Sequence, residues 1–281
     1  MSARAGAGAG AGAWARERLA QAIEAVGPLV VGFSGGADSA LLAHAATAAL
    51  GRAAVTCVTA VSPSLAPEEL ADCRALAAEW GLDWTPVDTE ELANPLYAAN
   101  DGSRCYHCKT ELMDALSPIA TAKGATVALG VNLDDLGDYR PGQQAATERG
   151  AVFPLVTAGL TKADVRGLSA ELGLRTADKP AAACLASRVP YGTAVSLGVL
   201  TEVAQAESGL KRLGFGDVRV RHYGDLARVE VPLAELARLL ERRDEVVAAV
   251  RAAGYRYVTV DWEGLRSGNL NEALQGLPEK P

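Results

Sequence analysis

Short apolar segments that alternate with helical stretches constrain the fold of this chain more than any other feature. The run PLVVGF over residues 28–33 is apolar along its whole length, as a strand buried on both sides must be. Helices that lie between successive strands cover both faces of a parallel sheet. We therefore predict an α/β fold with a parallel sheet. The predicted strands span residues 28–33, 54–61, 83–87 and 125–130, and the predicted helices span 14–26, 40–50, 67–80 and 109–123.

The pattern changes after about residue 180, which predicts a second, smaller α+β domain. Its expected elements are a helix over 199–213, a strand pair over 218–222 and 227–231, a helix over 233–253 and a strand over 255–261. The predicted organisation is a flexible Ala/Gly tail over 1–13, a first domain over 14–180, a loop or linker over 181–195 and the smaller domain over 196–275.

The segment GFSGGADS, residues 32–39, lies between a predicted strand and a predicted helix. Glycines let backbone N–H groups approach a phosphate, and the positive end of the helix faces it. Hydroxyls at both ends and Asp38 at the helix start favour a site for phosphate and a metal over a plain tight turn. The patterns GxxxxGK[ST] and GxGxxG are absent. The segment also satisfies G-x-S-x-G of α/β-hydrolases, but little chain precedes it to supply an oxyanion donor.

Charge and hydropathy disfavour two classes of partner. The chain has 281 residues and a net charge of −7, which argues against nucleic-acid binding, because such binding needs cations to neutralise phosphates. No stretch reaches the length of about 18 apolar residues that a membrane span needs. We expect a cytoplasmic protein, so its five cysteines are first considered as metal ligands, nucleophiles or core thiols rather than disulfides.

Three of the cysteines stand in segments that do not look like core. Cys184 lies in an aperiodic stretch between Lys179 and Arg188, whose charges would favour a thiolate, although a lone cysteine is more often a buried apolar residue. Cys105 and Cys108 form a CxxC in SRCYHCK, and the residues alone leave a zinc site, a redox pair and an unmarked loop open. Cys57 and Cys73 fall within a predicted strand and helix, so we expect core thiols.

Polar residues near predicted strands are candidate ligand contacts. Asn132 and Asp134 follow a strand, where α/β folds bind ligands, but they would serve equally well to cap the next helix. Arg219 and Arg221 alternate along a strand and so share a face, which suits a phosphate or an exposed charged surface. Glu207 and Glu230 are weaker candidates for contacts with metal or substrate.

The motif SGGADS resembles SGGxDS, the pyrophosphatase loop of the PP-loop ATP-pyrophosphatases, which adenylate a substrate with ATP. The resemblance implies that Ser34, Gly35, Gly36 and Ser39 hold phosphates and that Asp38 helps place Mg²⁺. The loop alone does not choose among amidating ligases, tRNA-thiolating enzymes and other sulfur transferases.

Four longer segments resemble the LarE family, which inserts sulfur into the nickel-pincer nucleotide cofactor. They are GVNLDDLGDYRPG at 130–142, KPAAACLASRVPYG at 179–192, VRVRHYGDLARVEV at 218–231 and GYRYVTVDWEGLRSGNLNE at 254–272. The resemblance implies a PP-loop domain that adenylates pyridinium-3,5-biscarboxylic acid mononucleotide, with Cys184 as the nucleophile that supplies or passes on sulfur.

The same resemblance implies further ligands and an assembly. Cys105, Cys108 and Cys184 fit the three-cysteine set that holds a 4Fe–4S cluster in some members. Substrate contacts are expected from Arg188, Arg219, Arg221, Glu207 and Glu230, and a homo-hexamer is the family's assembly. A tRNA thiolase or amidating enzyme, and an ATP-binding sensor without catalysis, are the alternatives.

Overall fold

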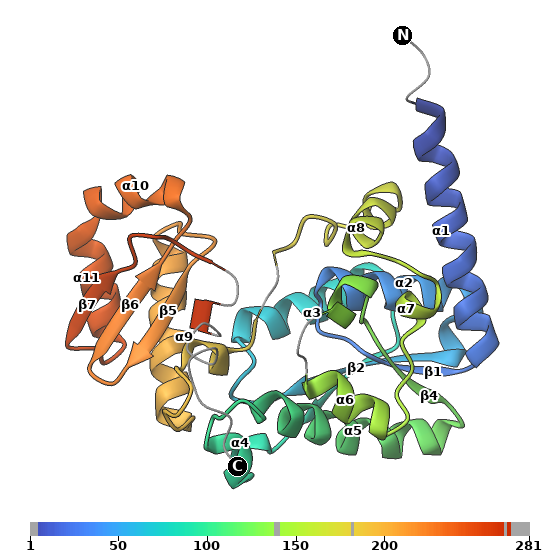
Figure 1. The fold of residues 1–281 in the computed structure, drawn as a ribbon, viewed down its shortest axis with the longest axis horizontal. Coiled ribbons are helices and arrows are strands. Elements are labelled where there is room, and N and C mark those ends of the chain that lie inside the picture. The colour runs from blue at the N-terminus through green and yellow to red at the C-terminus, as the bar shows by residue number, and fades with distance from the viewer. Residues whose placement is uncertain (1–4, 138–140, 181–182, 267–268, 271–281) are drawn as a thin grey trace. The chain divides into compact units, whose positions relative to one another are not determined.

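The computed structural model describes residues 5–137, 141–180, 183–266 and 269–270, which fold as two compact units (Figure 1). The first unit comprises Met1–Ser62, Pro67–Glu90 and Cys105–Ala182. The second comprises Pro63–Ala66, Glu91–Arg104 and Ala183–Pro281. The second unit thus includes two short segments that the sequence analysis placed in the first domain, and it also includes most of the predicted linker.

The first unit is an α/β layer structure with a four-stranded parallel sheet in the order β3-β2-β1-β4. Its strands are β1 (Leu29–Gly32), β2 (Val55–Val61), β3 (Trp84–Asp88) and β4 (Thr126–Leu129). Its helices are α1 (Ala5–Val26), α2 (Ala37–Leu50), η1 (Arg52–Ala54), α3 (Pro67–Glu79), α5 (Arg104–Lys123), η3 (Leu133–Gly137), α6 (Pro141–Glu148), α7 (Pro154–Thr157) and α8 (Lys162–Glu171). The predicted fold class and parallel sheet are confirmed.

Helices cover both faces of this sheet, as the apolar strands require (Figure 1). Leu29 and Val31 of β1 pack in one buried cluster with residues of α1, α2 and α8. Val30, between them, points to the other face and packs in a second cluster with Met113 and Leu116 of α5. This alternation along one strand gives the sheet two separate apolar layers, because successive side chains point to opposite faces.

Helix α1 corrects the prediction of a tail without structure. The helix begins at Ala5, so the Ala/Gly repeat over residues 5–13 is helical, while residues 1–4 lie outside the described part. Alanine has the highest intrinsic helix propensity, and here it alternates with glycine directly before the amphipathic stretch that packs on the sheet. Leu19 and Ile23 of that stretch are buried in the first apolar cluster.

The second unit is a three-stranded sheet with helices on one face. Its strands are β5 (Arg219–Tyr223), β6 (Leu226–Glu230) and β7 (Tyr257–Val260), in the order β5-β6-β7 with β5 and β6 antiparallel. Val220 and Val229 pack against α9 and α11, while Arg219, Arg221, Arg228 and Glu230 alternate with them on the opposite face. Its helices are η2 (Glu91–Ala93), α4 (Pro95–Ala98), η4 (Leu185–Arg188), α9 (Leu197–Arg212), η5 (Leu233–Glu235), α10 (Leu236–Glu241) and α11 (Arg243–Ala252).

The single helix predicted over 233–253 is divided at Arg242. The backbone of Arg242 leaves helical geometry, with ψ of 22°, and its guanidinium donates to the backbone carbonyl of Leu213 and to Glu245. α10 and α11 are therefore two helices instead of one continuous helix.

Buried hydrogen bonds explain why residues 91–104 belong to the second unit. The Asn100 amide is fully buried and donates to the carbonyl oxygens of Pro190 and Thr193, both at 2.8 Å. Its carbonyl oxygen accepts from Arg104, whose guanidinium also donates to the Ala186 carbonyl at 2.8 Å. These bonds fix the chain that follows Cys184, although Asn100 and its partners are about 90 residues apart in sequence.

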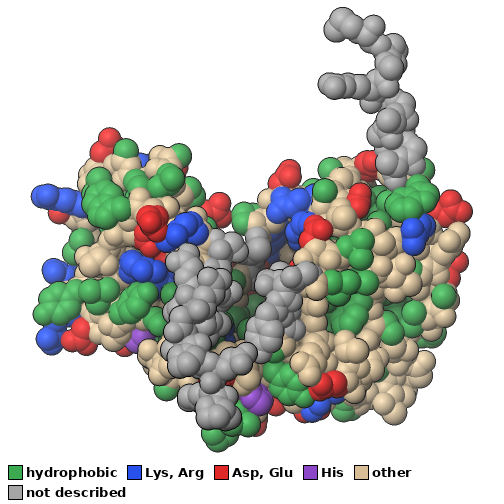
Figure 2. Space-filling view, viewed as in Figure 1, with side chains coloured by type: hydrophobic (Ala, Val, Ile, Leu, Met, Phe, Trp, Pro, Cys, Tyr) green, Lys and Arg blue, Asp and Glu red, His purple; other side chains and the backbone are tan. Residues whose placement is uncertain are grey.

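The surface shows no large single-sign region in the view of Figure 2, where acidic and basic side chains are interspersed on both units. Among the described residues, no helix has both the length and the apolar character of a membrane span.

We predict that Asn100→Ala lowers the free energy of unfolding by about 2–4 kcal/mol, because buried carbonyl groups lose the Asn100 donor and the Arg104 guanidinium loses one of its acceptors. Urea denaturation followed by circular dichroism measures the loss. Asn94→Ala is the matched control: Asn94 only caps the short helix α4, so its loss should cost about 1 kcal/mol or less. Equal losses in the two variants would contradict this account.

Candidate functional site

The loop between β1 and α2 has the geometry of an anion-binding turn. Gly35 has φ of +67°, which a residue with a side chain rarely adopts, and Gly36 is the N-cap of α2. The Ser39 hydroxyl accepts a hydrogen bond from the Ser34 backbone N–H at 3.2 Å and lies 3.0 Å from the Ser34 hydroxyl. Within the described part of the chain, no side chain caps the N-terminus of α2, so its first N–H groups are available to an anion.

The strand order brings a second segment to this loop. In the order β3-β2-β1-β4, the chain steps from β1 through β2 to β3 and then crosses over to place β4 on the other side of β1. Ligands bind beyond the strand ends at such a reversal of strand order. Gly130, just after β4, approaches so closely that a Cβ there would lie 2.6 Å from the Ser39 backbone nitrogen. Glycine at position 130 therefore lets the two strand ends converge.

Asp38 is the centre of the polar contacts at this point. Its carboxylate accepts from the Asn132 amide at 3.0 Å and forms an ion pair with the Lys162 ammonium at 2.5 Å. Asn132 is therefore brought to the loop, as expected. Lys162, the first residue of α8, was missed by the sequence analysis. The Thr161–Asp164 capping box marks the start of α8 in the sequence, but nothing local shows that Lys162 reaches back to Asp38.

Asp134 lies beside this group in a capping role. Its carboxylate accepts the backbone N–H of Lys162 at 2.9 Å, and its own N–H donates to the Asn132 side chain at 3.0 Å. Asp135 accepts the Asn132 backbone N–H at 3.1 Å. Both carboxylates thus position Lys162 and Asn132, and a direct contact of Asp134 with nucleotide stays a prediction.

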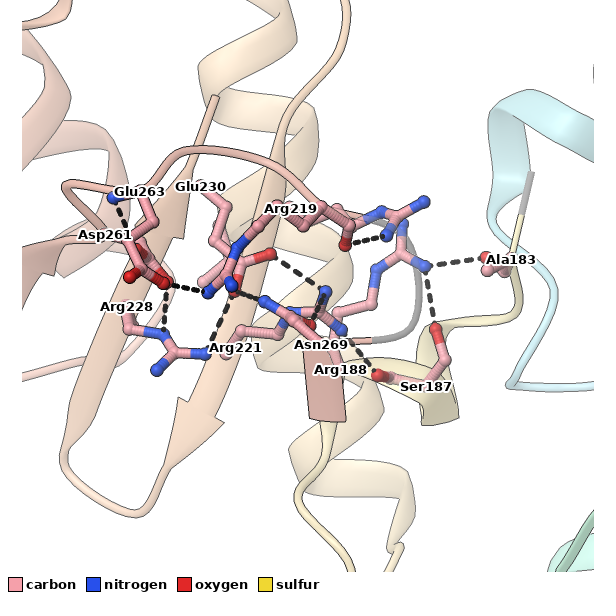
Figure 3. Close-up of polar contacts among 12 residues, drawn as sticks. Ala183, Ser187, Arg188, Arg219, Arg221, Arg228, Glu230, Asp261, Glu263 and Asn269 are labelled. Atoms are coloured by element: carbon pink, nitrogen blue, oxygen red, sulfur yellow. Dashed lines mark hydrogen bonds and ion pairs between the residues drawn. The ribbon is translucent and has the colours of Figure 1, made fainter. Parts of the chain in front are cut away.

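In the second unit, Arg188 and Glu207 form a buried, bidentate ion pair with distances of 2.7 and 3.0 Å. Glu207 also accepts the Val220 backbone N–H at 3.0 Å. The other guanidinium nitrogen donates to the carbonyl oxygens of Ala183 and Cys184, at 2.8 and 3.3 Å. Figure 3 shows the bond to Ala183. Arg188 therefore holds the backbone of Cys184 in place while its charge is balanced by Glu207.

A second buried pair lies beside the first on the polar face of the sheet. Arg221 donates to Glu230 at 2.8 Å, to Asn269 at 2.7 Å and to the Ser187 carbonyl at 2.8 Å. Glu230 has no exposed surface and also accepts from Arg228 and Asn269 (Figure 3). A carboxylate this deeply buried needs such donors, because desolvating it without them is costly.

Arg219 differs from its neighbours. Among the described residues it forms no ion pair with a carboxylate, and its guanidinium donates to the Arg266 carbonyl at 3.2 Å. Burial lowers the pKa of Arg219, and the nearby charges of Arg188 and Arg221 lower it further. Positive charge is thus in excess at Arg219, and a bound anion would relieve it.

The cysteines divide as the sequence analysis expected, with one correction. Cys57 and Cys73 are fully buried core thiols, and burial, with a smaller effect of Asp83, raises the pKa of Cys57 to about 12. Cys184 and Cys105 are exposed. The CxxC does not precede a helix that starts at residue 109: it lies in the first turn of α5, which begins at Arg104, after a turn in which Asp101 accepts from Ser103.

Cys105 and Cys108 belong to the first unit and Cys184 to the second. Within the described residues, no three His, Cys, Asp or Glu side chains are grouped as a metal site. The cluster ligand set therefore stays a prediction. Lys179 and Arg188, expected beside the Cys184 thiol, each have carboxylate partners: Glu69 and Asp72 for Lys179, and Glu207 for Arg188.

Known proteins resemble this chain over most of its length. Residues 14–112 match the family model for NAD synthase. An uncharacterized protein of Synechocystis sp. is 46% identical over 261 residues, which cover 92% of this chain and 97% of that protein. The pyridinium-3,5-bisthiocarboxylic acid mononucleotide synthase of Lactiplantibacillus plantarum is 37% identical over 257 residues, 91% of this chain and 93% of the synthase. An uncharacterized protein of Methanocaldococcus jannaschii is 25% identical over 241 residues, 85% of this chain and 91% of that protein.

These similarities agree with the geometry of both units. The NAD synthase match spans β1, the loop and α2 to β3, and with the parallel sheet it confirms the predicted PP-loop domain. The similarity to the L. plantarum synthase extends through both units, beyond the part that PP-loop proteins share. The chain therefore belongs to the LarE family of PP-loop proteins.

Proposed function

We propose that this protein is an ATP-dependent sulfur transferase that converts pyridinium-3,5-biscarboxylic acid mononucleotide to the bisthiocarboxylic acid mononucleotide. The observation that carries the proposal is the N-terminus of α2, which has no side-chain cap among the described residues and has Asp38 in its first turn. This site lies in a chain that is 37% identical to a protein named for the synthesis of that product. An exposed cysteine, Cys184, is held by its own backbone contacts in the second unit.

The loop would bind the phosphates of ATP. The first N–H groups of α2 and the hydroxyls of Ser34 and Ser39 supply donors, and the helix dipole favours negative charge there. Asp38 would hold Mg²⁺, which would supply positive charge to the departing pyrophosphate. A carboxylate oxygen is a ligand that suits this ion. Lys162, now paired with Asp38, provides a second cation at the same place.

Adenylation prepares the substrate for attack. A free carboxylate is a poor acyl donor because it carries no good leaving group. Its oxygen attacks the α-phosphorus of ATP, pyrophosphate leaves, and the acyl adenylate that forms has AMP as a good leaving group. The Cys184 thiolate then attacks the acyl carbon, the C–O bond to AMP breaks, and a thioester forms. Removal of the Cα proton of Cys184 breaks the Cβ–S bond, so sulfur leaves as a thiocarboxylate and dehydroalanine stays in the chain.

A 4Fe–4S cluster would spare Cys184 this loss. Cys105, Cys108 and Cys184 would hold it, and three thiolates leave one iron open to an additional sulfide. The first two suit this role because neither is in a disulfide and they are three residues apart in α5, so they lie on the same side of the helix.

The polar face of the second unit would bind the phosphate of the mononucleotide. Arg219 supplies the uncompensated charge, and Arg221 and Arg188 stand beside it. Glu207 and Glu230 act in this proposal through the arginines that they hold, because all their close contacts are with protein donors. A homo-hexamer and a cytoplasmic location stay predictions from the family resemblance and the composition.

We predict that Asp38→Asn reduces substrate-dependent pyrophosphate release at least about a hundredfold, because it removes the negative charge that would place the metal. A coupled pyrophosphate assay measures the rate. Asp114→Asn is the control, since Asp114 pairs with Arg149 on the exposed side of α5. Unchanged release in Asp38→Asn would remove this residue from the mechanism.

Cys184→Ala should keep pyrophosphate release but form no thiolated product, because adenylation precedes the step that needs the thiol. Mass spectrometry of the wild-type protein after turnover then separates the two sulfur routes. Loss of H2S at Cys184 means that the residue is consumed, and an intact thiol after several turnovers means that sulfur arrives from elsewhere. Thiolated product from Cys184→Ala would disprove the role of Cys184.

Protein purified without oxygen should contain iron and acid-labile sulfide, and Cys105→Ala should lose both because one of three thiolate ligands is gone. Cys57→Ala is the control, as Cys57 is buried in β2 and should leave the iron content unchanged. Iron-free wild-type protein that carries zinc instead would contradict the cluster.

A further inference from the structure

Lys179 is a largely buried lysine whose contacts the proposed mechanism does not use. Its side chain is 16% exposed, and its ammonium donates to three acceptors. They are the Gly35 carbonyl oxygen at 3.1 Å, Glu69 at 2.8 Å and Asp72 at 2.6 Å. An ammonium group has three N–H donors, so all of them are engaged.

The two carboxylates keep this lysine charged. Burial by itself lowers the pKa of Lys179, but the hydrogen bonds and charges of Asp72 and Glu69 outweigh burial and raise it. Arg175 shares Asp72, at 2.7 Å, and also pairs with Glu79 at 2.9 Å. Arg175 thus belongs to the same charged group as Lys179, but its ion pairs within the described part of the chain are with Asp72 and Glu79 and not with the loop.

The bond to Gly35 sets the direction of one peptide group. A peptide is planar and trans, so its C=O and N–H point in opposite directions. Lys179 draws the Gly35 carbonyl toward α3, where the Cys73 thiol also packs: a Cβ on Gly35 would lie 2.9 Å from the Cys73 sulfur. The Gly36 N–H of the same peptide is consequently held away from α3.

This peptide is the one in the loop most able to rotate. It joins two glycines, and without Cβ atoms its rotation by half a turn meets little steric resistance. After such a rotation a carbonyl oxygen, instead of an N–H donor, would face a phosphate, and the two negative partners would repel each other. The Lys179 ammonium, bound to the Gly35 carbonyl oxygen, prevents this rotation.

We propose that Lys179 is a positioning residue for ATP, which fixes the Gly35–Gly36 peptide so that its N–H faces the phosphates. The inference rests on the proposed function, since it assumes that the loop binds the phosphates of ATP. Lys179 itself touches neither nucleotide nor reacting atoms in this role.

Calorimetric titration of full-length variants with Mg-ATP, pyrophosphate and adenosine tests the role. Lys179→Met should weaken binding of ATP and pyrophosphate about tenfold or more, the usual effect of losing one charge-assisted hydrogen bond, and leave adenosine binding unchanged. Arg175→Met is the matched control: it disturbs the same carboxylates and should keep ATP and pyrophosphate affinities within about twofold of wild type. Lys179→Arg, which keeps the charge and a donor, should restore most of the affinity.

A second substitution distinguishes loss of the positioning role from a general loss of stability. Lys179→Met leaves Glu69 without its partner, whereas Asp72 keeps Arg175. The double variant Glu69→Gln/Lys179→Met restores the charge balance and should fold, yet show the same selective loss of ATP and pyrophosphate binding. Wild-type affinity for both in the double variant, or an equal loss for adenosine, would overturn the positioning role. Wild-type protein that binds neither ATP nor pyrophosphate would instead refute the proposed function itself.

Discussion

The convergence of two parallel strands at one edge of the first sheet is the constraint on which the candidate ATP site depends. β1 and β4 are neighbours and run in the same direction, so the segments after them meet even though they are about 100 residues apart in sequence. Only glycine at position 130 allows the distance of approach that is seen. The Asn132 amide, the Asp38 carboxylate and the start of α8 are brought together as a result.

In the second unit, buried ion pairs do the positioning that strand ends do in the first. Arg188 and Arg221 each donate hydrogen bonds from at least one guanidinium nitrogen to a carboxylate and from another to backbone carbonyls of residues 183–187. Residues 183–192, the described part of the segment around Cys184, contain one short 3-10 helix and no strand. Their conformation therefore depends on these arginines and on Asn100 and Arg104, which bond the residues that follow Cys184.

The sequence predicted what depends on local pattern. The apolar runs at residues 28–33 and 125–130 predicted strands of the sheet. SGGADS predicted a tight turn between a strand and a helix, because a strand, two glycines and a helix start leave few other geometries. The contacts of Lys162 and Asn100 were not predicted, because their partners are 124 and about 90 residues away in sequence and nothing in the neighbouring residues indicates the contact. The Ala/Gly repeat was misjudged because its composition suits both a linker and an extension of an existing helix.

The difference between local pattern and distant contact also explains why some residues predicted to contact a ligand have hydrogen-bond partners within the protein. Asp134, Glu207 and Glu230 were selected as carboxylates near a ligand, and each is engaged with protein donors. A buried carboxylate is stable only with its partners in place, so these residues can serve the ligand through what they hold. On the polar face of the second sheet, Glu207, Glu230 and Asp261 balance Arg188, Arg221 and Arg228, which leaves Arg219. If this face binds the phosphate of the mononucleotide, as proposed, its selectivity would depend on one unmatched arginine among matched ones, not on the number of arginines in the motif.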